Sequence, residues 1–225
     1  MKSKDNKKQN FFNKYGKFIL LDFFLLAILI TLLVLLGINS NVINIIDNSV
    51  FDFINIFRVP FVTNLALFIT YFGETITIIL LLIICLIIYK KESLPLVFST
   101  GTSAIINYLI KHIVKRPRPA GQFVTNLIID YPFPDGYSFP SGHSQTGLVF
   151  YYFLAYLLLS KYYKGKHKKL FLGLSLIFPI LIMLSRLILG VHYFTDILCG
   201  ATLGSLIIVN YFLITKIYNN KKEII

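Results

Sequence analysis

Charged side chains and cysteines are both scarce in this chain of 225 residues. Only 14% of the residues are charged, against about 25% in an average soluble domain, and 56% are hydrophobic. A soluble globular fold is therefore excluded. Cys85 and Cys199 both lie inside apolar runs, which excludes the disulfide framework of a small secreted protein.

Acidic side chains are scarcer still, so the formal net charge is +12. A nucleic-acid-binding protein would display its Lys and Arg side chains on a soluble face, whereas here they punctuate long apolar runs. We therefore expect no nucleic acid partner. No cluster of Asp, His or Cys has the spacing of a metal site, and we expect neither a metal nor another cofactor.

Six apolar runs are long enough to predict membrane-spanning helices, because a bilayer core about 30 Å thick needs roughly 20 apolar residues. They cover residues 18–38, 75–89, 94–110, 141–160, 170–191 and 194–215. The predicted fold is all-α, a six-helix membrane bundle that forms a single domain over residues 1–225. A short helix is expected before the second span, within residues 61–73.

The Lys and Arg side chains predict the orientation in the membrane. Sixteen lysines fall in the tails 1–17 and 216–225 and in the loops at 90–91 and 161–169. With six spans these segments share one face, which the positive-inside rule makes cytoplasmic. The other six cations fall outside: Arg58, Lys111, Lys115, Arg116, Arg118 and Arg186. The sequence thus predicts a plasma-membrane protein with both termini in the cytoplasm and its unusual segments outside.

An amphipathic helix is predicted between the first two spans. Apolar residues at 42, 46, 50, 53 and 57 alternate with Asn and Asp at 44, 48, 52 and 55, both at helical spacing. We expect it to lie in the outer headgroup layer as a covering helix without a catalytic part.

Three outer segments carry residues suited to chemistry, and the first is KHIVKRPRP at 111–119. Lys111 is expected to end a helix, and Pro117 and Pro119 then keep the cationic strip extended, with Arg118 able to reach over the bundle. A basic loop that binds acidic lipid headgroups is the alternative.

The second segment is PSGH at 140–143, where a loop enters a helix. The free N–H groups at Ser141 and Gly142, with the positive end of the helix dipole, can bind an anion. His143 could then exchange a proton near neutral pH. An ordinary helix cap with a structural histidine would have the same sequence.

The third segment is SRLILGVHYFTD at 185–196. His192 and Asp196 are four residues apart, so in a helix they share a face, and the carboxylate can hold one ring N–H and leave the other nitrogen free to attack. Arg186 offers a planar fork for phosphate oxygens. The alternative is a structural His–Asp pair beside an arginine that extends towards water.

The combination of the three segments favours phosphoryl transfer. Lys111, Arg118 and Arg186 in one pocket would repel one another unless a multiply charged anion bound there. Two histidines would supply a nucleophile and a proton donor, and the cations would neutralise charge without a metal. The residues therefore predict a metal-independent phosphatase.

These motifs resemble the three signatures of the type 2 phosphatidic acid phosphatase superfamily, and the likeness extends over nearly the whole chain. The resemblance implies that His192 attacks phosphorus to form a phosphohistidine, that Asp196 orients it, and that His143 protonates the leaving oxygen. It also implies a set of residues that hold the phosphate oxygens: Lys111, Arg118, Ser141, Gly142 and Arg186. Lys115, Arg116 and Glu74 lie outside the signatures and receive no assigned role, although Glu74 is a candidate for substrate access.

The implied substrate is a lipid phosphate such as phosphatidylglycerophosphate, undecaprenyl pyrophosphate or phosphatidic acid, with the bilayer as the other partner. The motifs would bind the phosphate rather than the lipid tail, so they do not identify one lipid as the substrate. They also give no information on the oligomeric state. A phosphatase for a soluble ester, which would need only a water-facing funnel, stays open. A lipid or anion transporter is disfavoured because its charges would lie at mid-span.

Overall fold

Helices make up the regular structure of the protein, and no strand occurs in the part of the chain that this computed structural model describes. That part comprises residues 2–124, 127–129 and 131–222, with side chains described from residue 14 to 220. The helices are α1 (Lys2–Gly37), α2 (Asn41–Asn55), α3 (Pro60–Thr70), α4 (Thr75–Tyr89), α5 (Leu94–Val114), α6 (Gly142–Tyr162), α7 (Lys168–Leu174), α8 (Ile177–Ile188) and α9 (Phe194–Lys222). The tail lysines at 2, 4, 7, 8, 221 and 222 fall outside the described side chains.

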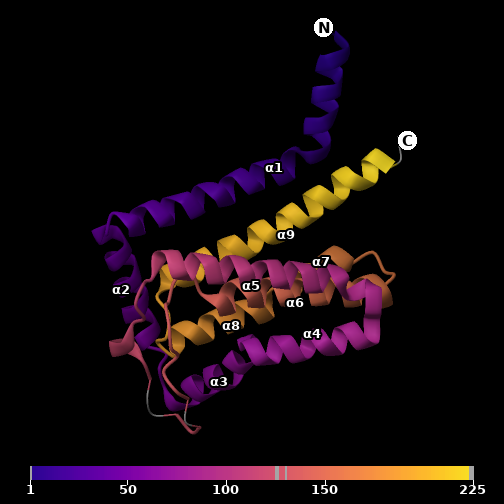
Figure 1. The fold of residues 1–225 in the computed structure, drawn as a ribbon. Helices are drawn as coiled ribbons and strands as arrows, with labels where there is room; N and C mark the ends of the chain where they lie inside the picture. Colours follow the sequence, from indigo (N-terminus) through magenta and orange to yellow (C-terminus); the bar gives the residue numbers. More distant parts are fainter. Residues whose placement is uncertain (1, 125–126, 130, 223–225) are drawn as a thin grey trace.

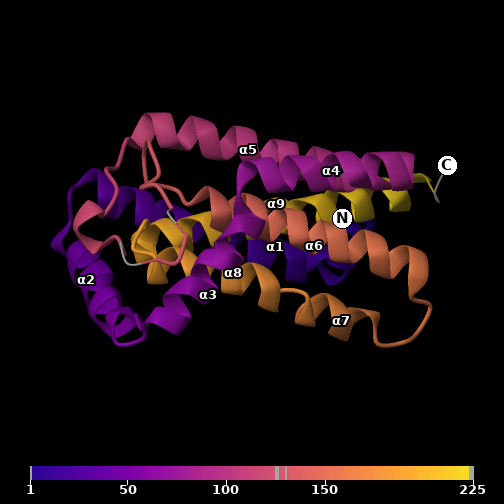
Figure 2. The same ribbon diagram turned by 90° about the horizontal axis from the view of Figure 1, so that it is seen from below.

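Helix α6 lies at the centre of the bundle. It packs against α5, α8 and α9, while α1 packs along α9 and α3 along α8 (Figure 1). Its side chains Val149, Phe150 and Phe153 are fully buried and join the core from α4 and α5. Seen from below, α2 lies across one end of the bundle (Figure 2).

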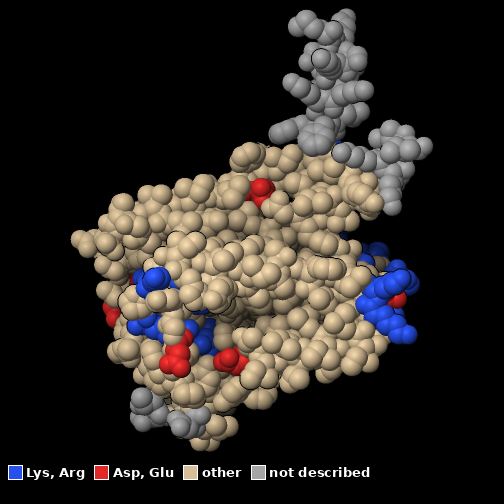
Figure 3. All heavy atoms as spheres, viewed as in Figure 1, with Lys and Arg blue, Asp and Glu red and all other residues tan. Residues whose placement is uncertain are grey.

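Large apolar side chains cover the outside of the bundle. Leu20, Phe23 and Phe24 of α1, Ile76 and Ile87 of α4, and Ile105 and Ile113 of α5 are all exposed. Figure 3 shows most of the charged side chains of this face at the two ends of the molecule, with one acidic side chain on the otherwise uncharged surface between them. Contiguous exposed apolar surface of this extent is suited to lipid rather than to water.

Three helical stretches are long and apolar enough to cross a membrane: Lys14–Gly37, Lys168–Ile188 and Phe194–Asn220. Helices α2 and α3, which are bent by 118° at their junction, make a fourth if they are taken together. The 15 residues of α4 extend only about 22 Å, and α5 and α6 carry polar side chains on their buried faces. The described chain therefore has three to four candidate spans by length and composition.

Several helix positions differ from the sequence-based expectation. Helix α5 continues past Lys111 to Val114 and is capped by Lys115, which adopts a left-handed conformation two residues before Pro117. The apolar run at 170–191 is interrupted between α7 and α8. In α2 the buried residues are Ile43, Asp47 and Ile54 rather than members of the predicted apolar stripe.

Candidate active site

The three predicted segments meet at the end of the bundle that α2 covers. His192 lies in the turn between α8 and α9, and this turn requires Gly190, whose φ is +71°. A Cβ atom at Gly190 would lie 1.9 Å from the carbonyl oxygen of Gln122. The absence of a side chain therefore lets the loop that carries Arg118 pack directly against the turn that carries His192.

His192 is buried and contacts the two groups that the predicted chemistry requires, the carboxylate of Asp196 and the guanidinium of Arg118. Its Nδ1 lies 3.4 Å from Asp196 Oδ2, and its Nε2 lies 3.1 Å from a terminal nitrogen of Arg118. Because a guanidinium only donates, Nε2 must accept, and we assign the ring proton to Nδ1 beside the carboxylate. The lone pair of Nε2 thus faces the cation that would bind a phosphate oxygen.

Asp196 is fully buried in the first turn of α9 and its two oxygens have different partners. Oδ2 accepts the backbone N–H of Tyr193 at 2.9 Å and faces His192. Oδ1 accepts from Arg116 at 2.7 Å. The carboxylate is therefore held on both sides, and its contact with His192 is fixed by a residue outside the predicted signatures.

His143 lies in the first turn of α6 and faces Glu74, in the turn before α4. Its Nε2 lies 3.4 Å from Glu74 Oε1, and Tyr131 donates a hydrogen bond to the same oxygen at 2.8 Å. Burial opposes ionisation of Glu74, but His143, Tyr131 and Arg186 outweigh it and lower the pKa of Glu74 to about 2. Glu74 therefore stays ionised beside His143, the predicted proton donor.

The three predicted cations are anchored by the surrounding backbone and hydroxyl groups. Lys111 Nζ donates to the carbonyl oxygen of Tyr137 at 2.7 Å, and Arg118 donates to that of Val191 at 3.0 Å. Arg186 is buried and donates to Tyr131 Oη at 2.7 Å. The Nε atoms of Arg118 and Arg186 are buried without a hydrogen-bond partner among the described residues.

The electrostatics of this cluster favour an anionic ligand. Burial and, to a smaller extent, the charge of Arg186 together lower the pKa of Arg118 to about 10. Burial also holds the pKa of His192 well below its usual value, and Arg118, Arg186 and Lys111 add to this effect. Buried like charges of this kind are destabilising until a multiply charged anion neutralises them.

The start of α6 differs in one detail from the expectation. The backbone N–H of Ser141 is not free, because it donates to the carbonyl oxygen of Asp196 at 3.0 Å. The Ser141 hydroxyl caps the helix by accepting from the N–H of Ser144 at 3.3 Å. Gly142 and His143 line a cavity of about 520 Å³ together with Lys111. Ser141 thus links the start of α6 to the backbone of Asp196 in the first turn of α9.

Sequence reasoning left several contacting residues without a role. Asp47, Thr195 and Tyr131 were not singled out, and Arg116 and Glu74 had no assigned contact. The sequence signal for Asp47 was its helical spacing from Ile43 and Ile54, which places the carboxylate on the same face of α2 as these two apolar side chains. Its partner lies 69 residues away in the chain, and no spacing rule connects the two.

A family model described as the PAP2 superfamily matches residues 92–222, which is more than half of the chain. The chain belongs to the PAP2 superfamily. It is therefore a hydrolase of the PAP2 phosphatase family. The matched region contains all eight residues predicted for the site, whereas Asp47 and Glu74 precede it.

Individual PAP2 proteins match over most of the chain. Phosphatidylglycerophosphatase B of Bacillus subtilis is 29% identical over 177 residues, covering 76% of this chain and 84% of the relative. An undecaprenyl-diphosphatase of Sulfolobus acidocaldarius is 30% identical over 198 residues, covering 85% and 87%. Each match thus covers most of the relative as well as most of this chain.

The fold is also similar to a crystal structure of the transmembrane PAP2 type phosphatidylglycerolphosphate phosphatase of Bacillus subtilis. The TM-score is 0.69 at 26% identity, and the match covers 84% of this chain and 94% of that chain. This PAP2 protein is accordingly a multi-pass membrane protein.

Proposed function

We propose that this protein removes phosphate from a membrane lipid, as a phosphomonoester or a pyrophosphate, with its site on the outer face of the membrane. The observation that carries the proposal is the cavity that begins at the site. Lys111, Gly142 and His143 lie at its polar end. Its other lining residues come from α4, α5 and α6 and include Ile78, Ile79, Leu82, Val97 and Ala104.

The shape of this cavity supports a lipid substrate over a soluble ester. An anionic group at the cationic end would leave its attached hydrocarbon beside apolar side chains of α4 and α5. A soluble phosphate would gain nothing from that apolar surface. The names of the relatives, a phosphatidylglycerophosphatase and an undecaprenyl-diphosphatase, agree in both being lipid phosphatases.

The proposed reaction has two steps. Nε2 of His192 attacks phosphorus, while Asp196 holds the Nδ1 proton and stabilises the imidazolium that forms. His143 donates a proton to the leaving oxygen, and the product lipid departs. Water then attacks the phosphohistidine and releases inorganic phosphate.

Binding of the phosphate oxygens is proposed for Lys111, Arg118, Arg186 and the Ser141–Gly142 segment. The three cations and the dipole of α6 would neutralise the charge that spreads over the phosphoryl oxygens. Among the described residues, no group of three or more His, Cys, Asp or Glu side chains could hold a metal ion. The proposed mechanism uses only the side chains named above.

For the membrane topology we propose six spans in a single domain over residues 1–225. These are the apolar part of α1, then α4, α5 and α6, the broken pair of α7 and α8, and α9. Helices α2 and α3 would lie at the outer surface. The lysine distribution then supports cytoplasmic tails and an outward-facing site in the plasma membrane.

The lipid specificity is tested by narrowing the cavity. Gly101 of α5 lines it, and a Cβ atom there meets no atom within 4 Å. With purified protein in detergent, phosphate release would be measured from phosphatidylglycerophosphate, undecaprenyl pyrophosphate, phosphatidic acid and soluble glycerol phosphate. Gly101→Phe should lower kcat/KM for the lipids about tenfold or more, equivalent to about 1.4 kcal/mol, and leave the soluble ester unchanged.

Ile105→Phe is the matched control, because Ile105 lies exposed on the same helix away from this cavity. It should leave both substrate classes unaffected. Preferential hydrolysis of the soluble ester, or an equal loss on both classes in Gly101→Phe, would contradict a lipid substrate.

A further inference from the structure

We infer that Asp47 and Arg116 are positioning residues for His192, acting through Asp196. The inference concerns α2, which the sequence suggested to be only a cover, and a cation outside the PAP2 signatures. It builds on the proposed role of His192 as the nucleophile. The connected side chains run from α2 through the loop after α5 to the start of α9.

Arg116 uses both arms of its guanidinium within this chain of contacts. One terminal nitrogen donates to Asp196 Oδ1 at 2.7 Å and to Thr195 Oγ1 at 2.8 Å. The other donates to Asp47 Oδ2 at 2.6 Å. Arg116 therefore joins two carboxylates in a geometry that a lysine cannot reproduce.

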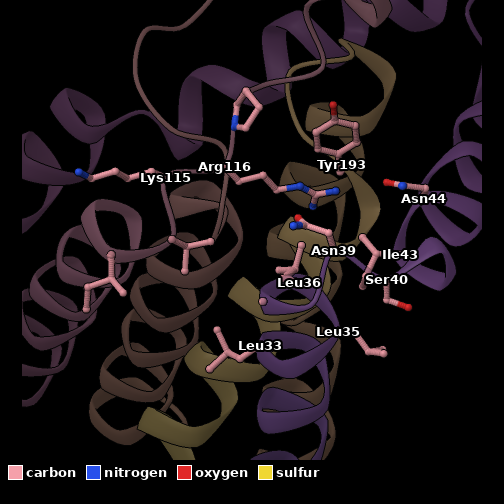
Figure 4. A pocket seen from close by; sticks show the side chains of 14 residues that line it. Leu33, Leu35, Leu36, Asn39, Ser40, Ile43, Asn44, Lys115, Arg116 and Tyr193 are labelled. Carbon is pink, nitrogen blue, oxygen red and sulfur yellow. The ribbon is translucent and has the colours of Figure 1, made fainter.

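The orientation of Arg116 is fixed by its surroundings. Its guanidinium lies over the ring of Tyr193, with Cζ 4.0 Å from the ring centroid. Figure 4 shows Arg116 reaching towards Tyr193, whereas the side chain of its neighbour Lys115 points the opposite way. Burial opposes ionisation, but Asp196 and Asp47 outweigh it and raise the pKa of Arg116 above its ordinary value.

Asp47 is buried and its oxygens are fully occupied by the start of α9 and by Arg116. Oδ1 accepts the backbone N–H of Thr195 at 2.9 Å, and Oδ2 accepts the Thr195 hydroxyl at 2.9 Å. Asp47 thus anchors the residue next to Asp196 directly. Helix α2 is thereby bound to the turn that carries the nucleophile.

These contacts set the orientation of the Asp196 carboxylate. With Oδ1 held by Arg116, Oδ2 is left facing the N–H of Tyr193 and Nδ1 of His192. Without Arg116, the carboxylate could rotate away from His192 and the Nδ1–H tautomer would lose its partner. Buried ion pairs are commonly no more stabilising than apolar side chains, so stability alone is a poor reason for this one.

The test uses Asp47→Asn, which keeps the size of the side chain but removes the charge that holds Arg116. Steady-state hydrolysis of a lipid phosphate in detergent should show kcat lowered by about 10- to 100-fold with KM changed by no more than about twofold. Asp52→Asn is the matched control, because Asp52 is exposed on the same helix, and it should behave as the wild type. A wild-type kcat in Asp47→Asn would overturn the inference.

Two further variants exclude a merely structural effect. Arg116→Lys retains a cation but not the fork, and it should reproduce the kcat loss, while Lys115→Gln should not. The double variant Asp47→Asn/Asp196→Asn should be no slower than Asp196→Asn alone, because Asp47 acts only through Asp196. Losses that multiply in the double variant would overturn the inference.

A measurement independent of activity separates this inference from the proposed function. In 15N-histidine-labelled protein, the His192 ring should be the Nδ1–H tautomer in the wild type and a mixture of tautomers in Asp47→Asn. The same tautomer in both proteins would overturn the inference. The tautomer could also change in Asp47→Asn while the wild-type protein releases no phosphate from any lipid. That result would support the positioning role and reject the proposal of a lipid phosphatase.

Discussion

The burial of His192 and the cations around it determine the protonation state of its ring. It is buried, it faces Arg118 through Nε2, and Arg186 and Lys111 also act on it. A histidine in such a place resists protonation, because an imidazolium there would be a further buried cation. The proposed nucleophile is therefore neutral in the free protein, and a bound phosphate would neutralise the cations around it.

A titration tests this property directly. Because burial and the neighbouring cations lower the pKa of His192 well below 6.5, its ring should still be neutral at pH 6.5, where a histidine in a model peptide is about half protonated. It should gain a proton only as the pH falls through that lowered value. Ring 15N shifts between pH 4 and 8, assigned with His192→Gln, would measure this. A midpoint at or above 6.5 would contradict the account.

The residues of the three motifs could be predicted because their chemistry is local. His192 and Asp196 share one helix-spaced segment, and Ser141, Gly142 and His143 adjoin a helix start. Contacts such as Asp47 with Arg116 could not be predicted, because they depend on how α2 packs over the bundle. Glu74 was predicted only as a candidate for substrate access, and its contact with His143 depends on how the helices pack.

Individual elements were predictable to different degrees. The helix at α2 was expected, yet its buried face is the one that carries Asp47. Periodicity alone assigns the most apolar face to the protein core, but at a membrane surface that face can equally meet lipid. The predicted stripe residues Val42, Phe53 and Phe57 are accordingly exposed.

The interruption between α7 and α8 and the cavity beside α4 and α5 were both invisible in the sequence. An apolar run stays apolar whether or not its helix is interrupted, so hydropathy does not locate the two residues between α7 and α8. Small residues of α5 and α6, such as Gly101, Ala104 and Gly142, are among those that line the cavity. Its existence depends on the spacing of helices, which no single segment encodes.

At the scale of the whole molecule, charge is separated between two ends (Figure 3). One end holds the lysine-rich loops near Lys90 and Lys164, and the other holds the site cations. This separation, together with the apolar surface between the ends, is the basis of the proposed orientation. The 22 Lys and Arg side chains that outnumber the 10 acidic ones thus fall into two groups, for which we propose separate roles.

Cysteine labelling in intact cells tests that orientation. Lys164→Cys should resist a membrane-impermeant maleimide until the membrane is permeabilised, because the proposed topology places it in the cytoplasm. Gly121→Cys, in the exposed loop beside the site, should react at once and serves as the positive control. The two native cysteines are buried and should contribute little background. The reverse labelling pattern would contradict an outward-facing site.

The central claim, that His192 carries the phosphoryl group without a metal, is tested most directly by trapping the intermediate. Purified protein would be mixed with a 32P-labelled lipid phosphate in the presence of EDTA, quenched within one turnover, and mapped for labelled peptides. The account predicts an acid-labile, base-stable phosphate on His192, absent in His192→Ala and retained in His112→Ala, which alters an exposed histidine at the end of α5. Phosphate release without a labelled enzyme, a label that persists in His192→Ala, or activity abolished by EDTA would contradict it.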